Sequence, residues 1–134
     1  MVANVIVEPT YFVPTQKAIN FGIMQLISQY CYIDPHLVHT MILYCPSEVF
    51  LLALYYLHYT ERTSNHFVTC VILACKYLDD YAMSLRAWED ITRIPVDVLR
   101  RFEMVVLKDL EYKLHVKEDF DCFCQHIKLL FPYI

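Results

Sequence analysis

The scarcity of glycine constrains the fold of this chain more than any other feature of its sequence. Only 1 of the 134 residues is glycine. Sheet-rich folds place many residues at positive φ in their turns, whereas helix bundles need few such residues. Outside Val2–Val7, no long alternating segment competes with helical periodicity. We therefore predict an all-α protein.

The composition points to protein partners. Hydrophobic residues make up 57% of the chain and charged residues 19%, which is apolar for one domain, so part of the apolar surface is expected to be exposed for a partner. The formal net charge of −4 argues against binding to nucleic acid, which requires clustered lysine and arginine. We expect no nucleic-acid partner.

The hydrophobic pattern does not predict membrane insertion. Charged and polar residues interrupt every apolar run before it reaches the roughly 20 residues needed to span a bilayer. The first residues carry no basic stretch of the kind that opens a secretory signal. We expect an intracellular protein, in the nucleus, the cytoplasm or both.

Helical periodicity and capping residues predict one domain. With Pro9 and Pro14, residues 1–14 form an irregular segment, and residues 15–134 form a single domain. Thr15, Asp34 and Ser84 are expected helix caps, and Pro46-Ser47 is expected to cap the third helix. The predicted helices span about residues 15–33, 35–44, 48–59, 65–80, 85–91, 95–112 and 117–131.

Two of these helices stand out. The helix at 48–59 is apolar on nearly every side, which is typical of a helix buried at the centre of a bundle. The apolar run Thr69–Asp80 is interrupted by Lys76. On a helical period Lys76 shares one side with Leu73, Tyr77 and Asp80. This helix end therefore either reaches water or docks another molecule.

The cysteines and histidines do not predict a reactive or metal site. We interpret the cysteines as free thiols, most of them small hydrophobes within helices. Cys122, Cys124 and His126 contain zinc-ligand types, but helical residues at i and i+2 point about 200° apart and no fourth ligand is evident nearby. The histidines lie in no recognisable acid–base or nucleophile motif. We expect no metal, no cofactor and no enzymatic activity.

Three stretches, in this order and spacing, resemble the cyclin box. They are Leu73–Asp80, which is similar to the end of the third box helix; Arg101–Leu114, which is similar to the fifth; and Tyr44–Leu57, which is similar to the entry to the second. With Trp88–Thr92, the resemblance covers about residues 35–116 and is nearest to the single-box phosphate-pathway (P-type) or cyclin Y-like subfamily. It implies a five-helix bundle with flanking N- and C-terminal helices.

The resemblance also implies a function. Cyclins bind and activate cyclin-dependent protein kinases and carry out no chemistry themselves. Lys76 and Glu103 stand where the family's lysine and glutamate contact the base of the kinase's mobile regulatory helix. Around these charges, Leu73, Tyr77 and Leu99 are expected to supply the apolar contact with the kinase.

The chain departs from the cell-cycle cyclins at a second surface. Those proteins carry a Met-Arg-x-x-Leu motif on the first box helix, paired with an aspartate on the second, and the two form a substrate-docking groove. Here the first box helix reads Leu37–Tyr44 without that motif, and His58 stands at the aspartate position. We therefore do not expect this groove. At Asp97 the chain has an acidic residue where some members present a basic residue to the kinase.

Two alternatives remain open from the sequence. Lys76 is otherwise a lysine whose long side chain reaches solvent from a helix end, and Glu103 is otherwise solvated or paired with a neighbour such as Arg100. At the level of function, the alternative is a kinase-independent helical adaptor or a transcription-factor-like scaffold with a cyclin fold.

Overall fold

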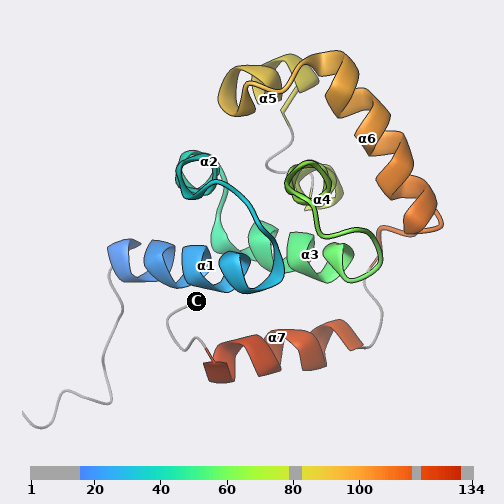
Figure 1. The fold of residues 1–134 in the computed structure, drawn as a ribbon. Coiled ribbons are helices and arrows are strands. Elements are labelled where there is room, and N and C mark those ends of the chain that lie inside the picture. The colour runs from blue at the N-terminus through green and yellow to red at the C-terminus, as the bar shows by residue number, and fades with distance from the viewer. Residues whose placement is uncertain (1–15, 79–82, 116–118, 131–134) are drawn as a thin grey trace, which may run out of the picture.

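Seven α-helices and no strand are present in the part of the chain that the computed structural model describes, which is residues 16–78, 83–115 and 119–130 (Figure 1). The helical fold class predicted from the sequence is confirmed. The helices are α1 (Gln16–Tyr30), α2 (Pro35–Ile42), α3 (Ser47–Leu57), α4 (Ser64–Leu78), α5 (Leu85–Thr92), α6 (Val96–Asp109) and α7 (Asp119–Leu130). The predicted irregular segment 1–14, the cap at Thr15 and the helix end at 79–81 lie outside the described residues.

Local side-chain chemistry explains where several helices begin. Asp34 Oδ1 accepts a hydrogen bond from the His36 backbone N–H at 3.0 Å, and Ser84 Oγ accepts one from Ala87 N–H at 3.1 Å, so both predicted caps are confirmed. The cap predicted at Pro46-Ser47 is right only in position, because Pro46 is the N-cap residue but no side chain caps α3. Pro46, with φ −74° and ψ 166°, precedes the helix, and Ser47 is the first residue of α3.

The predicted and observed helix boundaries differ in part because two helices end at positive-φ residues that are not glycine. The prediction ran α6 to residue 112, but it ends at Asp109 because Glu111 and Tyr112 have positive φ, 55° and 59°. The Tyr112 N–H donates to Leu107 O at 2.8 Å and the Glu111 N–H to Lys108 O at 3.0 Å. This pair of bonds is a Schellman motif built without glycine. Likewise, α5 ends at Thr92 because the next residue, Arg93, has a φ of 64°.

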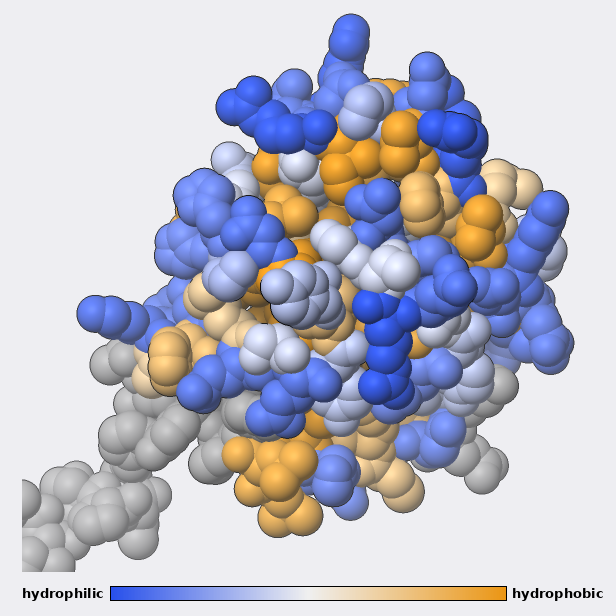
Figure 2. Space-filling model, viewed as in Figure 1, coloured by the Kyte–Doolittle hydropathy of each residue, from blue (hydrophilic) through white to orange (hydrophobic). Residues whose placement is uncertain are grey.

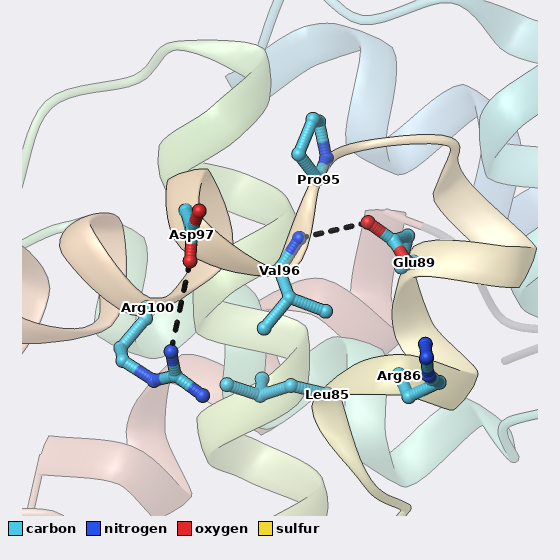
Figure 3. Close-up of a pocket in the computed structure, with 7 residues that line it drawn as sticks. All are labelled: Leu85, Arg86, Glu89, Pro95, Val96, Asp97 and Arg100. Atoms are coloured by element: carbon cyan, nitrogen blue, oxygen red, sulfur yellow. Dashed lines mark hydrogen bonds and ion pairs between the residues drawn. The ribbon is translucent and has the colours of Figure 1, made fainter.

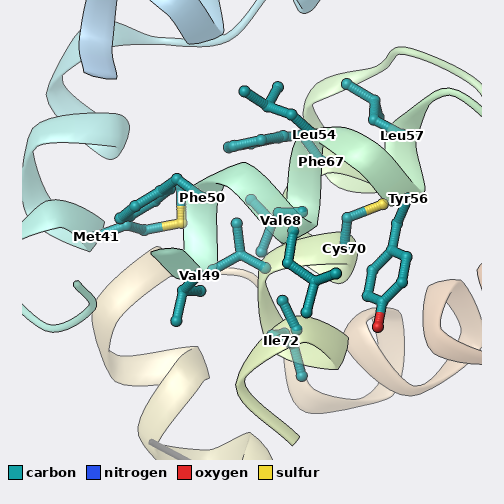
Figure 4. Close-up of a cluster of buried hydrophobic side chains, with 14 of the residues drawn as sticks. Met41, Val49, Phe50, Leu54, Tyr56, Leu57, Phe67, Val68, Cys70 and Ile72 are labelled. Atoms are coloured by element: carbon teal, nitrogen blue, oxygen red, sulfur yellow. The ribbon is translucent and has the colours of Figure 1, made fainter. Parts of the chain in front are cut away.

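Two helices form the centre of the fold, as predicted for α3. Eight of the 11 residues of α3 and ten of the 15 residues of α4 are buried. The side chains of the two helices interleave in one cluster that also receives Met41 from α2 (Figure 4). Each large apolar side chain buried in this cluster stabilises the fold by about 2 kcal/mol relative to the same side chain exposed to water. These two helices therefore supply most of the apolar burial.

The other helices surround this pair. Helices α1 and α7 pack against α3, α2 packs against α1, α6 packs against α4, and α5 bridges α2 and α6 (Figure 1). Gly22 is buried on α1, beside Ile23 in the core. Trp88 of α5 is 0% exposed, which confirms its prediction as a core residue. This packing places the last turn of α4 against the middle of α6.

The last helix is only partly as predicted. Ile127 is fully buried, and Phe120 and Phe123 pack against the core, but Leu130 is 55% exposed. Leu130 is the last residue of α7 and lies beyond the aromatic contacts with α3, so it does not join the stripe. None of the described helices is long and apolar enough to cross a membrane.

Candidate partner-binding site

An ion pair joins the last turn of α4 to the middle of α6. Lys76 Nζ lies 2.5 Å from Glu103 Oε2. The Lys76 side chain is 42% exposed and that of Glu103 is 17% exposed. A lysine is favourable in the last turn of a helix because it faces the negative end of the helix dipole. The structure therefore brings together the two charged residues singled out in the sequence.

The neighbouring charged residues of α6 form a second ion pair. Arg100 Nη1 lies 3.7 Å from Asp97 Oδ1, on the exposed side of α6. Glu103 is thus paired with Lys76 on another helix and not with Arg100, which was the alternative partner on α6 itself. Lys76 both reaches solvent and is paired with Glu103.

The apolar residues expected around the ion pair are divided between the core and the surface. Tyr77 is 42% exposed, but Leu73 and Leu99 are each 2% exposed. In this structure the two leucines are buried where α4 and α6 pack together. Their expected role as contacts for a partner stays a prediction.

Sequence reasoning missed two exposed apolar residues on α6. Met104 is 48% exposed and Val105 is 44% exposed, and both follow Glu103 in the chain. The helical period of the sequence indicates this exposure, because residues 104 and 105 lie outside the apolar stripe of α6 that contains Leu99 and Val106. We use the term contact surface for Lys76, Tyr77, Glu103 and Met104; Val105 points to the other side of α6, because helical residues at i and i+2 lie about 200° apart.

An open depression of about 580 Å³ lies between α5 and the start of α6 (Figure 3). In it, Glu89 of α5 accepts a hydrogen bond from the Val96 N–H at 3.0 Å and so caps α6 through its side chain. The residues that line it are Leu85, Arg86, Glu89, Pro95, Val96, Asp97 and Arg100. The helix that carries Glu103 is therefore anchored to α5 at its beginning.

His58 lies on another side of the molecule, between α1 and α7. Its ring is 5.4 Å from the ring of Tyr30 and 5.2 Å from that of Phe123, both edge-on. Arg62 Nη2 lies 3.4 Å from His58 Nδ1. Burial, and then the charge of Arg62, lower the pKa of His58. At the position of the family's aspartate, this chain thus has an aromatic packing contact.

Apolar side chains are also exposed elsewhere. Figure 2 shows hydrophobic residues scattered among hydrophilic ones, with a group along the lower edge, where Figure 1 places α7. On α7, Leu129 is 83% exposed and Leu130 is 55% exposed. Isolated exposed apolar residues are ordinary on protein surfaces, so exposure alone does not identify a site.

The described residues contain no group of three or more His, Cys, Asp or Glu side chains that could hold a metal ion. Cys122 is exposed and Cys124 is half-buried, and all six cysteines are free thiols.

The architecture defines a helical protein whose most distinctive surface feature is an interhelical ion pair. The family model described as cyclin, N-terminal domain, matches residues 36–115, which is more than half of the chain and includes α2 to α6 with both Lys76 and Glu103. The chain belongs to the cyclin family, whose members are generally regulatory and not catalytic. No curated protein and no solved structure matched it.

Proposed function

We propose that this chain is the regulatory subunit of a cyclin-dependent protein kinase, which it binds and activates in the nucleus or the cytoplasm. The observation that supports this proposal most is the Lys76–Glu103 ion pair, which joins α4 to α6 within the region matched by the cyclin family. We further propose that the chain belongs to the P-type or Y-like cyclins.

In this proposal the contact surface holds the kinase's mobile regulatory helix in its inward position. That position lets the kinase form its own lysine–glutamate ion pair and order its activation loop, which completes the phosphoryl-transfer site. The cyclin contributes no group to the chemistry. Its effect is a shift of the kinase population toward the active conformation.

The ion pair is suited to such a contact. An exposed or half-exposed pair contributes at most about 1 kcal/mol to folding, so Lys76 and Glu103 are not needed mainly for stability. Pairing keeps Glu103, which is largely buried, from facing an apolar interface without a partner. When a kinase docks, backbone groups at a helix end can share these charges, which fixes the register of the two proteins.

Apolar contact comes from Tyr77 and Met104, which are each exposed by 42% or more. Interfaces draw their affinity from such aromatic and flexible apolar side chains near their centre. Leu73 and Leu99 hold α4 and α6 together beneath them. The charges and the apolar residues thus have separate roles, in orientation and in affinity.

The test begins with capture of the tagged chain from the cells that produce it, followed by identification of the bound kinase and an activity assay. We expect a cyclin-dependent kinase that phosphorylates substrate only with the chain bound. With that kinase purified, single charge reversals Lys76→Glu and Glu103→Lys should each weaken binding at least tenfold, about 1.4 kcal/mol.

The double variant Lys76→Glu/Glu103→Lys separates a contact from a structural pair. It restores opposite charges across α4 and α6, so its thermal stability should return toward that of the parent. Its kinase affinity should stay low because the kinase meets inverted charges. Lys128→Glu on α7 is the control and should bind normally.

Full binding by the double variant would show that the pair only joins helices. Capture of protein partners without any kinase would instead support the helical adaptor or the transcription-factor-like scaffold.

A further inference from the structure

Two buried cysteines from distant parts of the chain meet next to the contact surface. Cys45 lies in the connection between α2 and α3, and Cys75 lies in the last turn of α4, one residue before Lys76. They are 30 positions apart in sequence, yet their Sγ atoms are 3.8 Å apart. Cys45 is 6% exposed and Cys75 is 0% exposed.

This separation is short enough for a covalent bond to form with small movements. A disulfide holds its sulfur atoms about 2.05 Å apart, so the Sγ atoms would approach by roughly 1.8 Å. Rotation about the Cα–Cβ bonds moves a sulfur by that amount, although the dense core around Cys75 also requires a small shift of the backbone. The connection that carries Cys45 is short and irregular, and it can supply that shift.

The environment also favours reaction of one sulfur. The hydrogen bond shared by the two thiols lowers the pKa of Cys75, whereas the same bond together with burial raises the pKa of Cys45. A thiolate stabilised by a neighbouring S–H group is the reactive form of cysteine. The second thiol is already in place to resolve an oxidised first one.

We propose that Cys45 and Cys75 form a reversible disulfide when hydrogen peroxide oxidises the protein. The Cys75 thiolate attacks one peroxide oxygen, so an S–O bond forms, the O–O bond breaks and the leaving hydroxide takes up a proton to become water. Cys45 then attacks the sulfenic sulfur, the S–S bond forms and the oxygen leaves as a second water. Two thiols are oxidised to one disulfide while one peroxide is reduced to two waters.

The bond would tie the α2–α3 connection to the helix turn that carries Lys76. It would close a loop across α3 and most of α4, and so restrict the unfolded chain. Peroxide is a suitable oxidant because it is small, whereas a bulky disulfide reagent cannot reach sulfurs that are 0% and 6% exposed. This inference does not depend on a kinase partner.

The experiment treats the purified, reduced full chain with hydrogen peroxide, removes the peroxide, unfolds the chain in denaturant, blocks the remaining thiols by alkylation and maps peptides by mass spectrometry. We expect one linked peptide pair that contains Cys45 and Cys75, a mass lower by two hydrogens and full reversal by dithiothreitol. The thermal midpoint should rise on oxidation and fall back on reduction.

Matched variants define the specificity. Cys45→Ala and Cys75→Ala should each abolish both the linked peptide and the rise in thermal midpoint, whereas Cys70→Ala, which removes another fully buried thiol of α4, should retain both. Peptide mapping of the parent chain decides the question even if an alanine variant fails to fold. Oxidation of the exposed Cys122 while Cys45 and Cys75 stay alkylatable, or linkage between other cysteines, would overturn the proposal.

Discussion

Lys76 illustrates how one residue can satisfy two interpretations. Its side chain is 42% exposed, as expected for a lysine at a helix end, and its Nζ atom is also bound to Glu103. The free energy of such a pair within one chain is small, so its value lies in orientation. The ion pair therefore marks the candidate site, and its larger energetic effect is expected on partner binding and not on folding.

His58 is expected to make stability depend on pH. Its folded-state pKa is lowered by burial and by Arg62, so as the pH falls the unfolded chain takes up this proton first. The stabilising contribution is present above the ordinary histidine pKa of about 6.5 and is lost as the pH falls through the lowered folded-state value. Chemical denaturation between about pH 7 and pH 5 should show a smaller loss of stability for His58→Gln than for the parent.

The control for this measurement is His39→Gln, which removes an exposed imidazole from α2. Its stability should follow the pH dependence of the parent. If the stability of His58→Gln falls with decreasing pH as steeply as that of the parent, the pH dependence does not come from His58.

Glu111 is a position where glycine should stabilise the protein. It adopts a φ of 55° at the end of α6, in the left-handed region that costs a non-glycine residue about 1 kcal/mol. Glu111→Gly should therefore raise the free energy of unfolding by roughly 0.5 kcal/mol, after the greater flexibility of the unfolded chain is included.

Thermal or urea unfolding measures this change. The matched substitution Lys108→Gly, within the same helix, should lower stability by about 1 kcal/mol. A loss of stability in Glu111→Gly would show that the Glu111 side chain, which lies 3.6 Å from Lys113 Nζ, matters more than its backbone.

At the scale of elements, α7 is held by its beginning and by an aromatic cluster. Tyr55 donates a hydrogen bond to Asp119 Oδ1 at 2.7 Å and Tyr59 donates one to Asp119 Oδ2 at 3.3 Å. The ring of Tyr55 also lies edge-on to that of Phe120, 5.1 Å away. Among the described residues of α7 only Ile127 is buried, so the helix relies on these contacts with α3 to hold its position.

Replacement of Asp119 should therefore loosen α7 selectively. Asp119→Ala removes two charge-assisted hydrogen bonds and a favourable charge at the helix N-terminus, so we expect a loss of about 2 kcal/mol. Hydrogen exchange should become faster in α7 while α4 stays protected.

Asp121→Ala is the matched control, since it removes an acidic residue of the same helix turn that accepts no tyrosine hydrogen bond among those described. It should cost only about 0.5 kcal/mol. Equal losses of stability in the two variants would show that Asp119 stabilises α7 only through the helix dipole and not through the tyrosine hydrogen bonds.

At the scale of the whole molecule, stability rests on the α3–α4 core. Leu54 is 0% exposed at the centre of α3, so Leu54→Ala should lower the free energy of unfolding by about 2–5 kcal/mol through lost burial and a residual cavity. Leu129→Ala, at a position 83% exposed, should change it by less than about 0.5 kcal/mol. Urea unfolding of both variants compares the two positions. Similar losses would contradict the central position of α3.

The sequence alone was sufficient for the helical class, the order of the helices and the central position of α3, because these depend on local periodicity, capping and the near absence of glycine. It also identified Lys76 and Glu103, through a resemblance confirmed at the level of the family. Boundaries such as the end of α6 were missed, because glycine is the usual signal for a left-handed residue and Glu111 and Tyr112 take that role here.

Only the tertiary structure decided which apolar residues near the ion pair are exposed. Leu73 and Leu99 share helix faces with the ion pair, yet they are buried where α4 and α6 meet, while Met104 and Val105 stay exposed. It also brought Cys45 to within 3.8 Å of Cys75. The physical reason is that periodicity defines the face of a helix, whereas exposure and distance depend on how separate helices pack.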